Sequence, residues 1–161
     1  MSFRIGQGFD VHRLVERRAL ILAGVEIAHS RGLEGHSDAD VLAHAVADAL
    51  LGALGAGDLG TYFPSSDPRW RGASGAMLLA PILVRVNDSG WRIGNVDTTI
   101  IAQEPRLSPY ADKLRSGLAG LLRIEEARVN VKLKSTDRLG AVGRGEGIAA
   151  QAVVLLEGVD A

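Results

Sequence analysis

Apolar residues change their spacing from one segment of this chain to the next. Across residues 41–54 they recur at helical intervals, and two glycines follow closely. Across residues 129–134 they alternate with polar residues, which is the pattern of a strand whose two faces differ. These patterns predict strands at residues 3–10, 19–23, 25–27, 94–103, 129–134 and 148–156, and helices at 41–54, 74–88 and 109–122.

The order of these elements predicts one α/β (α+β) domain over residues 1–161. The helices should pack on one face of a mixed, four-stranded sheet, and the two short strands around Gly24 should form a small N-terminal hairpin. Residues 29–38 are polar and contain glycine, so a loop is predicted there. Because only the glycine-rich segment 139–147 joins the last two strands, we expect them to be antiparallel.

The composition narrows the class of protein. The charges balance, with 18 Lys and Arg against 19 Asp and Glu, so no basic stripe indicates nucleic acid as a partner. Apolar stretches end well before the ~20 residues of a membrane span, and the first four residues lack the apolar core of a signal peptide. Without cysteine, disulfides, thiolate metal sites and a cysteine nucleophile are excluded. We expect a cytoplasmic protein without a membrane partner.

All four histidines fall between residues 12 and 44. Asp10 and His12 are two residues apart at the end of a predicted strand, so both side chains point the same way. His44, on the following helix, can supply a third ligand. Two imidazoles and a carboxylate suit zinc with one open coordination position. The alternative is an aspartate that caps a turn beside a surface histidine.

The segment from His36 to Asp40 precedes that helix. A hydroxyl and an imidazole before a helix can hold an anion, because helical N–H groups point at it, but Asp38 and Asp40 argue against a bare anion site here. Asp38 is expected to cap the helix, and a carboxylate here could also orient a ligating histidine. Asp40, His44 and Asp48 recur at every fourth position and share one face. An ordinary capped loop remains the alternative.

Two further polar segments suit substrate binding. Carboxylates on the glycine loop 57–72 suit sugar hydroxyls, although solvated turn carboxylates are more common. Segment 132–147 offers lysines, arginines, hydroxyls and glycines for phosphate, and Asp137 could hold Mg²⁺ together with phosphate oxygens; a charged hairpin is the alternative. Since no Gly-x-Ser-x-Gly elbow or other nucleophile motif is found, the pattern favours metal-assisted phosphoryl chemistry.

Five motifs, in order, carry a resemblance to a known family. They are Gly8-Phe9-Asp10-Val11-His12, His36-Ser37-Asp38-Ala39-Asp40-Val41 to His44, Gly57-Asp58-Leu59-Gly60, Asn95-Val96-Asp97 to Ile100-Ile101-Ala102-Gln103, and Gly143-Arg144-Gly145-Glu146-Gly147. Together they resemble the 2-C-methyl-D-erythritol 2,4-cyclodiphosphate synthase family of the non-mevalonate isoprenoid pathway. The resemblance implies a lyase that converts 4-diphosphocytidyl-2-C-methyl-D-erythritol 2-phosphate to the cyclic diphosphate and releases CMP.

The resemblance also implies cofactors and catalytic residues. Asp10, His12 and His44 match the zinc ligands, and Asp137 matches the ligand of a second divalent ion, Mg²⁺ or Mn²⁺. His36 and Ser135 match residues that orient the phosphates and steady the transition state. The substrate's own 2-phosphate is the implied nucleophile, which agrees with the lack of one in the protein.

The implied assembly is a homotrimer with active sites at subunit interfaces. The implied contacts to the methylerythritol part are Asp58 and Gly60, and Ser37, Phe63 and Asp67 are also expected to bind the substrate. The cytidine pocket, contributed by the neighbouring subunit, is implied to consist of Ala102, Pro105, Arg106, Leu107, Ser108, Leu133 and Lys134. Arg144 matches a basic residue near the trimer axis, where some members bind an isoprenoid diphosphate in a central channel. Small residues on the last strand, Ala149, Ala150 and Ala152, would allow close subunit approach.

The chain departs from the usual family pattern at a few positions. Ser135 and Asp137 stand where Thr and Glu are usual, and Lys134 replaces a small residue. Ser65 stands where many members carry Asp, and Ala141 replaces a bulky apolar residue. Two other functions stay open at this point: a metallophosphohydrolase that forms a linear product, and a non-enzymatic oligomer that binds a metal or an isoprenoid.

Overall fold

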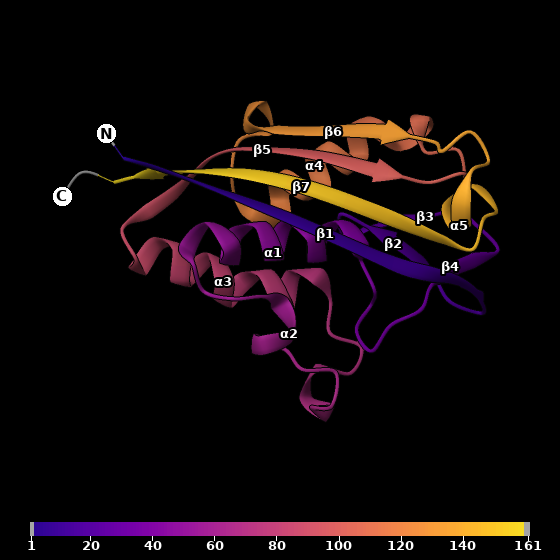
Figure 1. Cartoon of the computed structure of the whole chain (residues 1–161), viewed down its shortest axis with the longest axis horizontal. Helices are drawn as coiled ribbons and strands as arrows, with labels where there is room; N and C mark the ends of the chain where they lie inside the picture. The colour runs from indigo at the N-terminus through magenta and orange to yellow at the C-terminus, as the bar shows by residue number, and fades with distance from the viewer. Residues whose placement is uncertain (1, 160–161) are drawn as a thin grey trace.

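The computed structural model describes residues 2–159 and has a five-stranded mixed sheet at its centre (Figure 1). The order across the sheet is β4-β1-β7-β5-β6. Strands β1 and β5 both run antiparallel to β7, whereas β5 and β6 are parallel. The strands of this sheet are β1 (Phe3–Glu16), β4 (Arg31–Leu33), β5 (Trp91–Ile101), β6 (Val129–Lys134) and β7 (Gly147–Gly158).

The predicted mixed α+β fold is confirmed, but the sheet has five strands rather than four. The fifth, β4, lies in a segment predicted to be a loop, and it pairs with the far end of β1. Strand β1 does not stop at Asp10 but continues to Glu16, which gives β4 its partner. Three residues with Gly32 in the middle are too few to show an alternating pattern. The predicted hairpin is present as β2 (Leu20–Leu22) and β3 (Val25–Ile27).

The last two strands run in opposite directions, as expected, but they are not neighbours. Strand β5 lies between β6 and β7, so the glycine-rich connection crosses over one strand. Helix α4 (Ala111–Leu122) makes the long connection that the parallel pair β5 and β6 requires. Shorter helical turns fill the loops: α2 (Leu59–Tyr62), η1 (Pro68–Trp70), η2 (Ser108–Tyr110), η3 (Glu126–Arg128) and α5 (Gly140–Gly143).

The three predicted helices are present, and two of them, α1 (Val41–Leu54) and α3 (Gly75–Asp88), lie side by side below the sheet in Figure 1. The residue that caps α1 is Asp40, whose side chain accepts a hydrogen bond from the N–H of Ala43, so the prediction of Asp38 was wrong. Ser74 caps α3 as expected. Within residues 2–159, the helices are all too short or too polar to span a membrane.

Helix α1 packs directly on the backbone of β1. A Cβ atom added to Gly6 would lie 1.8 Å from the carbonyl oxygen of Ala49, and one added to Gly8 would lie 1.9 Å from that of Ala45. On β7, Ala150 and Ala152 face the same side and are 0% and 1% exposed. Ala150 and Ala152 were predicted to allow close approach of a neighbouring subunit. Within a single chain, their small side chains already allow α1 to pack closely on the sheet.

The opposite face of the sheet exposes several large apolar side chains within residues 2–159. Side chains alternate along a strand, and Gly6 and Gly8 of β1 face α1. The odd-numbered residues of β1 therefore point away from α1. The large apolar residues exposed there are Phe3, Ile5, Phe9 and Val11 of β1 and Val153 of β7. The two ends of the described chain also meet on this sheet, where the N–H of Gly158 donates to the carbonyl oxygen of Ser2 at 2.9 Å.

Candidate active site

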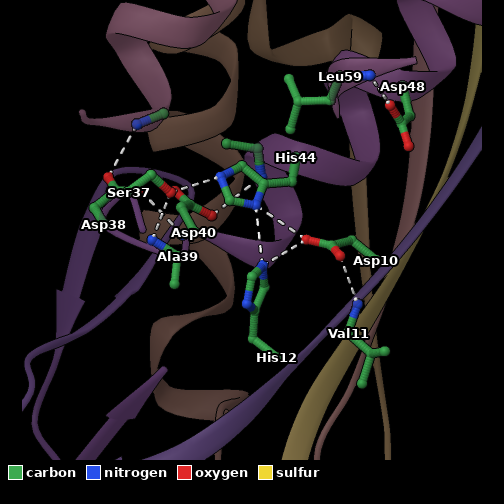
Figure 2. A network of polar contacts seen from close by, with 12 residues as sticks. Asp10, Val11, His12, Ser37, Asp38, Ala39, Asp40, His44, Asp48 and Leu59 are labelled. Atoms are coloured by element: carbon green, nitrogen blue, oxygen red, sulfur yellow. Dashed lines mark hydrogen bonds and ion pairs between the residues drawn. The ribbon is translucent and has the colours of Figure 1, made fainter. Parts of the chain in front are cut away.

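Asp10, His12 and His44 meet between β1 and α1 (Figure 2). The even-numbered residues of β1 face the helix, and His44 lies in the first turn of α1. Asp10 Oδ2 lies 2.9 Å from His12 Nε2 and 3.0 Å from His44 Nδ1, and the two nitrogens are 3.1 Å apart. Ligand atoms at ~2.0–2.1 Å from a tetrahedral zinc ion are about 3.3 Å apart, so this triangle has nearly the size that zinc requires.

The other polar atoms of Asp10, His12 and His44 contact neighbouring groups, which keeps Asp10 Oδ2, His12 Nε2 and His44 Nδ1 directed toward one another. His12 Nδ1 lies 2.7 Å from the carbonyl oxygen of Glu34, to which its N–H donates. His44 Nε2 lies 3.1 Å from Ser37 Oγ. Asp10 Oδ1 accepts the N–H of Val11 at 2.9 Å. Each imidazole therefore has an outer partner that leaves the inner nitrogen free for a metal.

The triad is electrostatically suited to a cation. Burial alone would raise the pKa of Asp10, but hydrogen bonds from His12 and His44 hold that pKa well below its usual range. Burial alone would lower the pKa of His12, yet the hydrogen bond and charge of Asp10 outweigh it and raise the pKa. An ionised carboxylate thus stabilises positive charge at this point, whether a proton or a metal ion carries it.

The two aspartates before the helix have a structural role. The buried carboxylate of Asp40 accepts three backbone hydrogen bonds, from Ala23 at 3.0 Å, Gly24 at 2.7 Å and Ala43 at 3.1 Å. It therefore ties the β2–β3 hairpin to α1 and does not orient His44. Asp38 accepts the N–H of Gly75 at 2.9 Å and joins the loop to α3. The side chain that contacts the outer nitrogen of His44 is Ser37.

A cavity of about 370 Å³ opens beside the triad. Most residues predicted for the metal and methylerythritol part line it: Asp10, His12, His36, Ser37, His44, Asp58, Gly60 and Phe63. Asp67 is not in the lining; its carbonyl oxygen accepts a hydrogen bond from His36 Nε2 at 3.1 Å, and its carboxylate pairs with Arg69. The carboxylate of Asp58 caps α2 through the N–H of Thr61 at 2.8 Å.

The sequence had not assigned five of the lining residues to the site: Asp48, Leu59, Ser65, Trp70 and Leu78. Asp48 lies one helical turn after His44, and its Oδ1 accepts the N–H of Leu59 at 2.7 Å (Figure 2). Burial raises the pKa of Asp48. Its spacing from His44 was visible in the sequence and could have placed it in the site. Trp70, by contrast, reaches the cavity through a loop and contacts Phe63 edge-on, which no periodic pattern signals.

The residues predicted for the cytidine pocket gather elsewhere. They line a second cavity of about 230 Å³ formed by Ala102, Pro105, Arg106, Leu107, Ser108, Leu133 and Lys134, with Ile100 and Gln103. Ser135, predicted to act with His36 on the phosphates, also lines this cavity and not the one beside the triad. Arg106 Nε donates to Ser108 Oγ at 2.9 Å, and the N–H of Ala102 donates to the carbonyl oxygen of Lys134 at 2.9 Å. The two cavities share no lining residue, so one chain does not bring the two predicted halves together.

Asp137 and Arg144 lie apart from both cavities. Asp137 is exposed and has a φ of 53°, in the left-handed region, on the turn after β6. Arg144 lines a third cavity of about 350 Å³ with Gln103, Glu104 and Arg138. Its Nε donates to Glu146 at 2.5 Å.

The chain is similar in sequence to proteins of a known family. Residues 3–157 match the model of the YgbB family. The chain is a member of the YgbB family. It is 59% identical to the 2-C-methyl-D-erythritol 2,4-cyclodiphosphate synthase of Geobacillus kaustophilus over 155 residues, which are 96% of this chain and 98% of that enzyme. The family expected from the five motifs is thereby confirmed.

Solved structures of YgbB-type proteins share the fold. The CDP complex of IspF from Plasmodium falciparum is 33% identical with a TM-score of 0.86, and the match covers 99% of this chain and 98% of that one. The bifunctional IspDF of Campylobacter jejuni is 41% identical with a TM-score of 0.94. In that case the match covers 99% of this chain but only 43% of the bifunctional protein, so this chain spans less than half its length.

Proposed function

We propose that this chain converts 4-diphosphocytidyl-2-C-methyl-D-erythritol 2-phosphate to 2-C-methyl-D-erythritol 2,4-cyclodiphosphate and CMP. The observation that carries the proposal is the triangle of Asp10, His12 and His44, whose ligand atoms lie 2.9–3.1 Å apart beside a cavity. The donor set suits zinc with one open position. Zinc bound there would polarise a phosphate oxygen and neutralise charge as it develops.

The proposed reaction needs no nucleophile from the protein. An oxygen of the 2-phosphate attacks the β-phosphorus, the bond between that phosphorus and the α-phosphate oxygen breaks, and CMP leaves with the electron pair. The chain's own residues position the phosphates. Ser37 Oγ accepts a hydrogen bond from the N–H of Ala39 at 3.0 Å and lies 3.1 Å from His44 Nε2. With a metal on His44 Nδ1, the proton of that ring is on Nε2 and points to Ser37 Oγ, so the hydroxyl proton of Ser37 is free to donate to a phosphate oxygen.

His36 and Asp58 are proposed to hold the two ends of the methylerythritol diphosphate. His36 uses Nε2 for the carbonyl oxygen of Asp67, which leaves Nδ1 for a phosphate oxygen when the ring is protonated. Asp58 uses Oδ1 to cap α2 and keeps its second oxygen for a sugar hydroxyl. Gly60 leaves the backbone there open to close approach, since only Asp58 lies near an added Cβ.

We further propose a homotrimer in which each site is shared by two subunits. The support is twofold: the predicted metal and cytidine residues line separate cavities, and one face of the sheet exposes Phe3, Ile5, Phe9 and Val11. Apolar patches of this kind mark subunit contacts. The neighbour would supply the cytidine cavity with Ser135, and Asp137 would hold Mg²⁺ or Mn²⁺ together with substrate phosphates. Arg144 would lie near the axis, where an isoprenoid diphosphate could bind.

The proposal can be tested with purified protein, zinc, Mg²⁺ and the diphosphocytidyl substrate, followed by ³¹P NMR. CMP and the cyclic diphosphate should appear together, and His44→Ala should abolish both. CMP with a linear product would instead favour the metallophosphohydrolase. Zinc binding without any turnover would favour a non-enzymatic metal-binding protein.

A further inference from the structure

Arg18 lies outside the cavity but holds the loop that carries two of its residues. It is in the turn between β1 and β2 and is partly buried. Its Nη1 donates to the carbonyl oxygen of Gly35 at 3.1 Å, and its Nη2 donates to that of Ser37 at 2.9 Å. The two carbonyls flank His36, so one guanidinium group fixes the backbone on both sides of that histidine.

The geometry points to Arg18 as a positioning residue for the proposed reaction, acting through the His36–Ser37 backbone on the phosphate and metal sites. This inference rests on the proposed function. Neither the family resemblance nor the cavity lining had assigned Arg18 a role.

The four successive carbonyl groups of residues 34–37 each accept one hydrogen bond from another part of the described chain. The carbonyl oxygen of Glu34 accepts from His12 at 2.7 Å, and that of His36 accepts the N–H of Gly72 at 2.8 Å. Those of Gly35 and Ser37 are the ones that Arg18 binds. Gly35 also sits in a narrow space, where an added Cβ would lie 2.9 Å from Ala39 Cβ and 3.3 Å from His12 Cε1. A small backbone shift here would therefore reach a metal ligand.

The effect of Arg18 passes to the metal through Ser37. Ser37 Oγ contacts His44 Nε2 at 3.1 Å, and this contact selects Nδ1 as the metal-binding nitrogen. If the carbonyl of Ser37 is released, its hydroxyl moves with it. Both the orientation of the His44 ring and the hydroxyl proton proposed to meet a phosphate oxygen would change.

Arginine suits this task better than lysine. A planar guanidinium presents several donors in a fixed fork and can satisfy two carbonyls at once, whereas an ammonium group is a point charge on a flexible stem. A role limited to charge would be met by either residue. A role limited to stability would leave the metal geometry and the chemical step unchanged.

The test compares Arg18→Met and Arg18→Lys with Arg17→Met as a matched control. Arg17 is adjacent and exposed, and removing it makes the same change in net charge. For Arg18→Met we expect kcat to fall by about 10²-fold, the cost typical of misplaced catalytic groups, with a smaller change in KM. Arg18→Lys should keep the charge and still lose most of that rate. Added guanidinium should partly restore Arg18→Met.

A second readout does not depend on turnover. In the Co²⁺-substituted protein, the visible absorption bands report ligand geometry; they should shift in Arg18→Met and stay unchanged in Arg17→Met. The inference is overturned if Arg18→Met matches the control in both kcat and the cobalt spectrum, or if Arg18→Lys restores full rate. If the wild type formed no cyclic product while the cobalt bands still shifted, the proposed function would fail and the positioning role at the metal would stand.

Discussion

The two imidazole rings of the metal centre are held by their outer nitrogens, His12 by a backbone carbonyl and His44 by a hydroxyl. The sequence could predict the inner ligands, because an Asp-x-His pair on a strand and a histidine on the next helix form a local pattern. It could not predict the outer partners. The outer partners are the backbone carbonyl of Glu34 and the hydroxyl of Ser37, and such contacts leave no regular spacing in the sequence. The same holds for Arg18, which binds two backbone carbonyls of the loop.

At the residue scale, Ser37→Ala should weaken zinc binding by about 10–100-fold, because removal of an outer partner of a ligating histidine typically has this effect. Ser37→Thr keeps a hydroxyl and should retain most of the affinity. Titration against a chromophoric chelator measures the change. Ser135→Ala is the control, since Ser135 lies in the other cavity; an equal loss in both alanine variants would contradict the assignment.

The raised pKa of His12 predicts how metal binding depends on pH. A raised pKa means that His12 holds its proton to higher pH than an ordinary histidine, so the metal must displace that proton. The apparent zinc affinity should therefore begin to fall at a higher pH than it would with an ordinary histidine ligand, and it should decrease further as the pH is lowered. Asp10 stays ionised over this range because its pKa is lowered. Affinity that stayed constant down to pH 5.5 would rule out the proton competition.

At the scale of elements, the site depends on how closely α1 approaches β1. The backbone of each is in contact at Gly6 and Gly8, so the distance between His44 on the helix and Asp10 and His12 on the strand is fixed by main-chain packing. Side-chain rearrangement in the core cannot easily change it.

Gly8→Ala should therefore destabilise the protein by about 3 kcal/mol or more, because the new methyl group would overlap backbone atoms of α1. Gly120→Ala is the matched control: nothing lies within 4 Å of its added Cβ, and alanine in helix α4 should be neutral or stabilising by up to ~1 kcal/mol. Urea unfolding of both variants measures the difference. Similar midpoints would show that α1 can move away at little cost.

Several elements that the sequence predicted correctly have regular apolar patterns, as in residues 41–54 and 129–134, and the short hairpin strands were marked by the glycine between them. The errors have two physical causes. Strand β4 is three residues long and depends on a pairing with residues 14–16 that its own sequence does not reveal. The insertion of β5 between β6 and β7 is decided by long-range packing, whereas the prediction used only the short connection between the last two strands.

At the scale of the whole molecule, the proposed assembly supplies what the single chain lacks. The predicted metal and cytidine residues form separate cavities, and the sheet face with the exposed apolar side chains offers a surface for contact. The residues of each cavity could be predicted because they follow family motifs. Their separation within one chain agrees with the family resemblance, which implies that a neighbouring subunit contributes the cytidine pocket. Residue patterns alone do not give this separation, because it depends on where β6 lies in the sheet.

Two inactive variants should complement each other if the sites are shared. His44→Ala damages the metal half and Ser135→Ala the cytidine half, so a mixed trimer contains some sites that take an intact half from each variant. With random exchange of equal amounts, about one quarter of the sites should be intact. Activity is measured after mixing under conditions that allow subunit exchange. No recovery, with mixed trimers confirmed by mass spectrometry, would place both halves of a site in one subunit.

The hydrogen bond between Ser2 and Gly158 brings the two ends of the described chain to one corner of the sheet. Residues 2 and 158 are therefore already side by side, and a short linker between them could close the described chain into a ring without disturbing any strand pairing. An added domain would leave the molecule from the same place whichever end carried it. The geometry of the metal centre therefore depends less on the order of the elements along the chain than on the contact between α1 and β1.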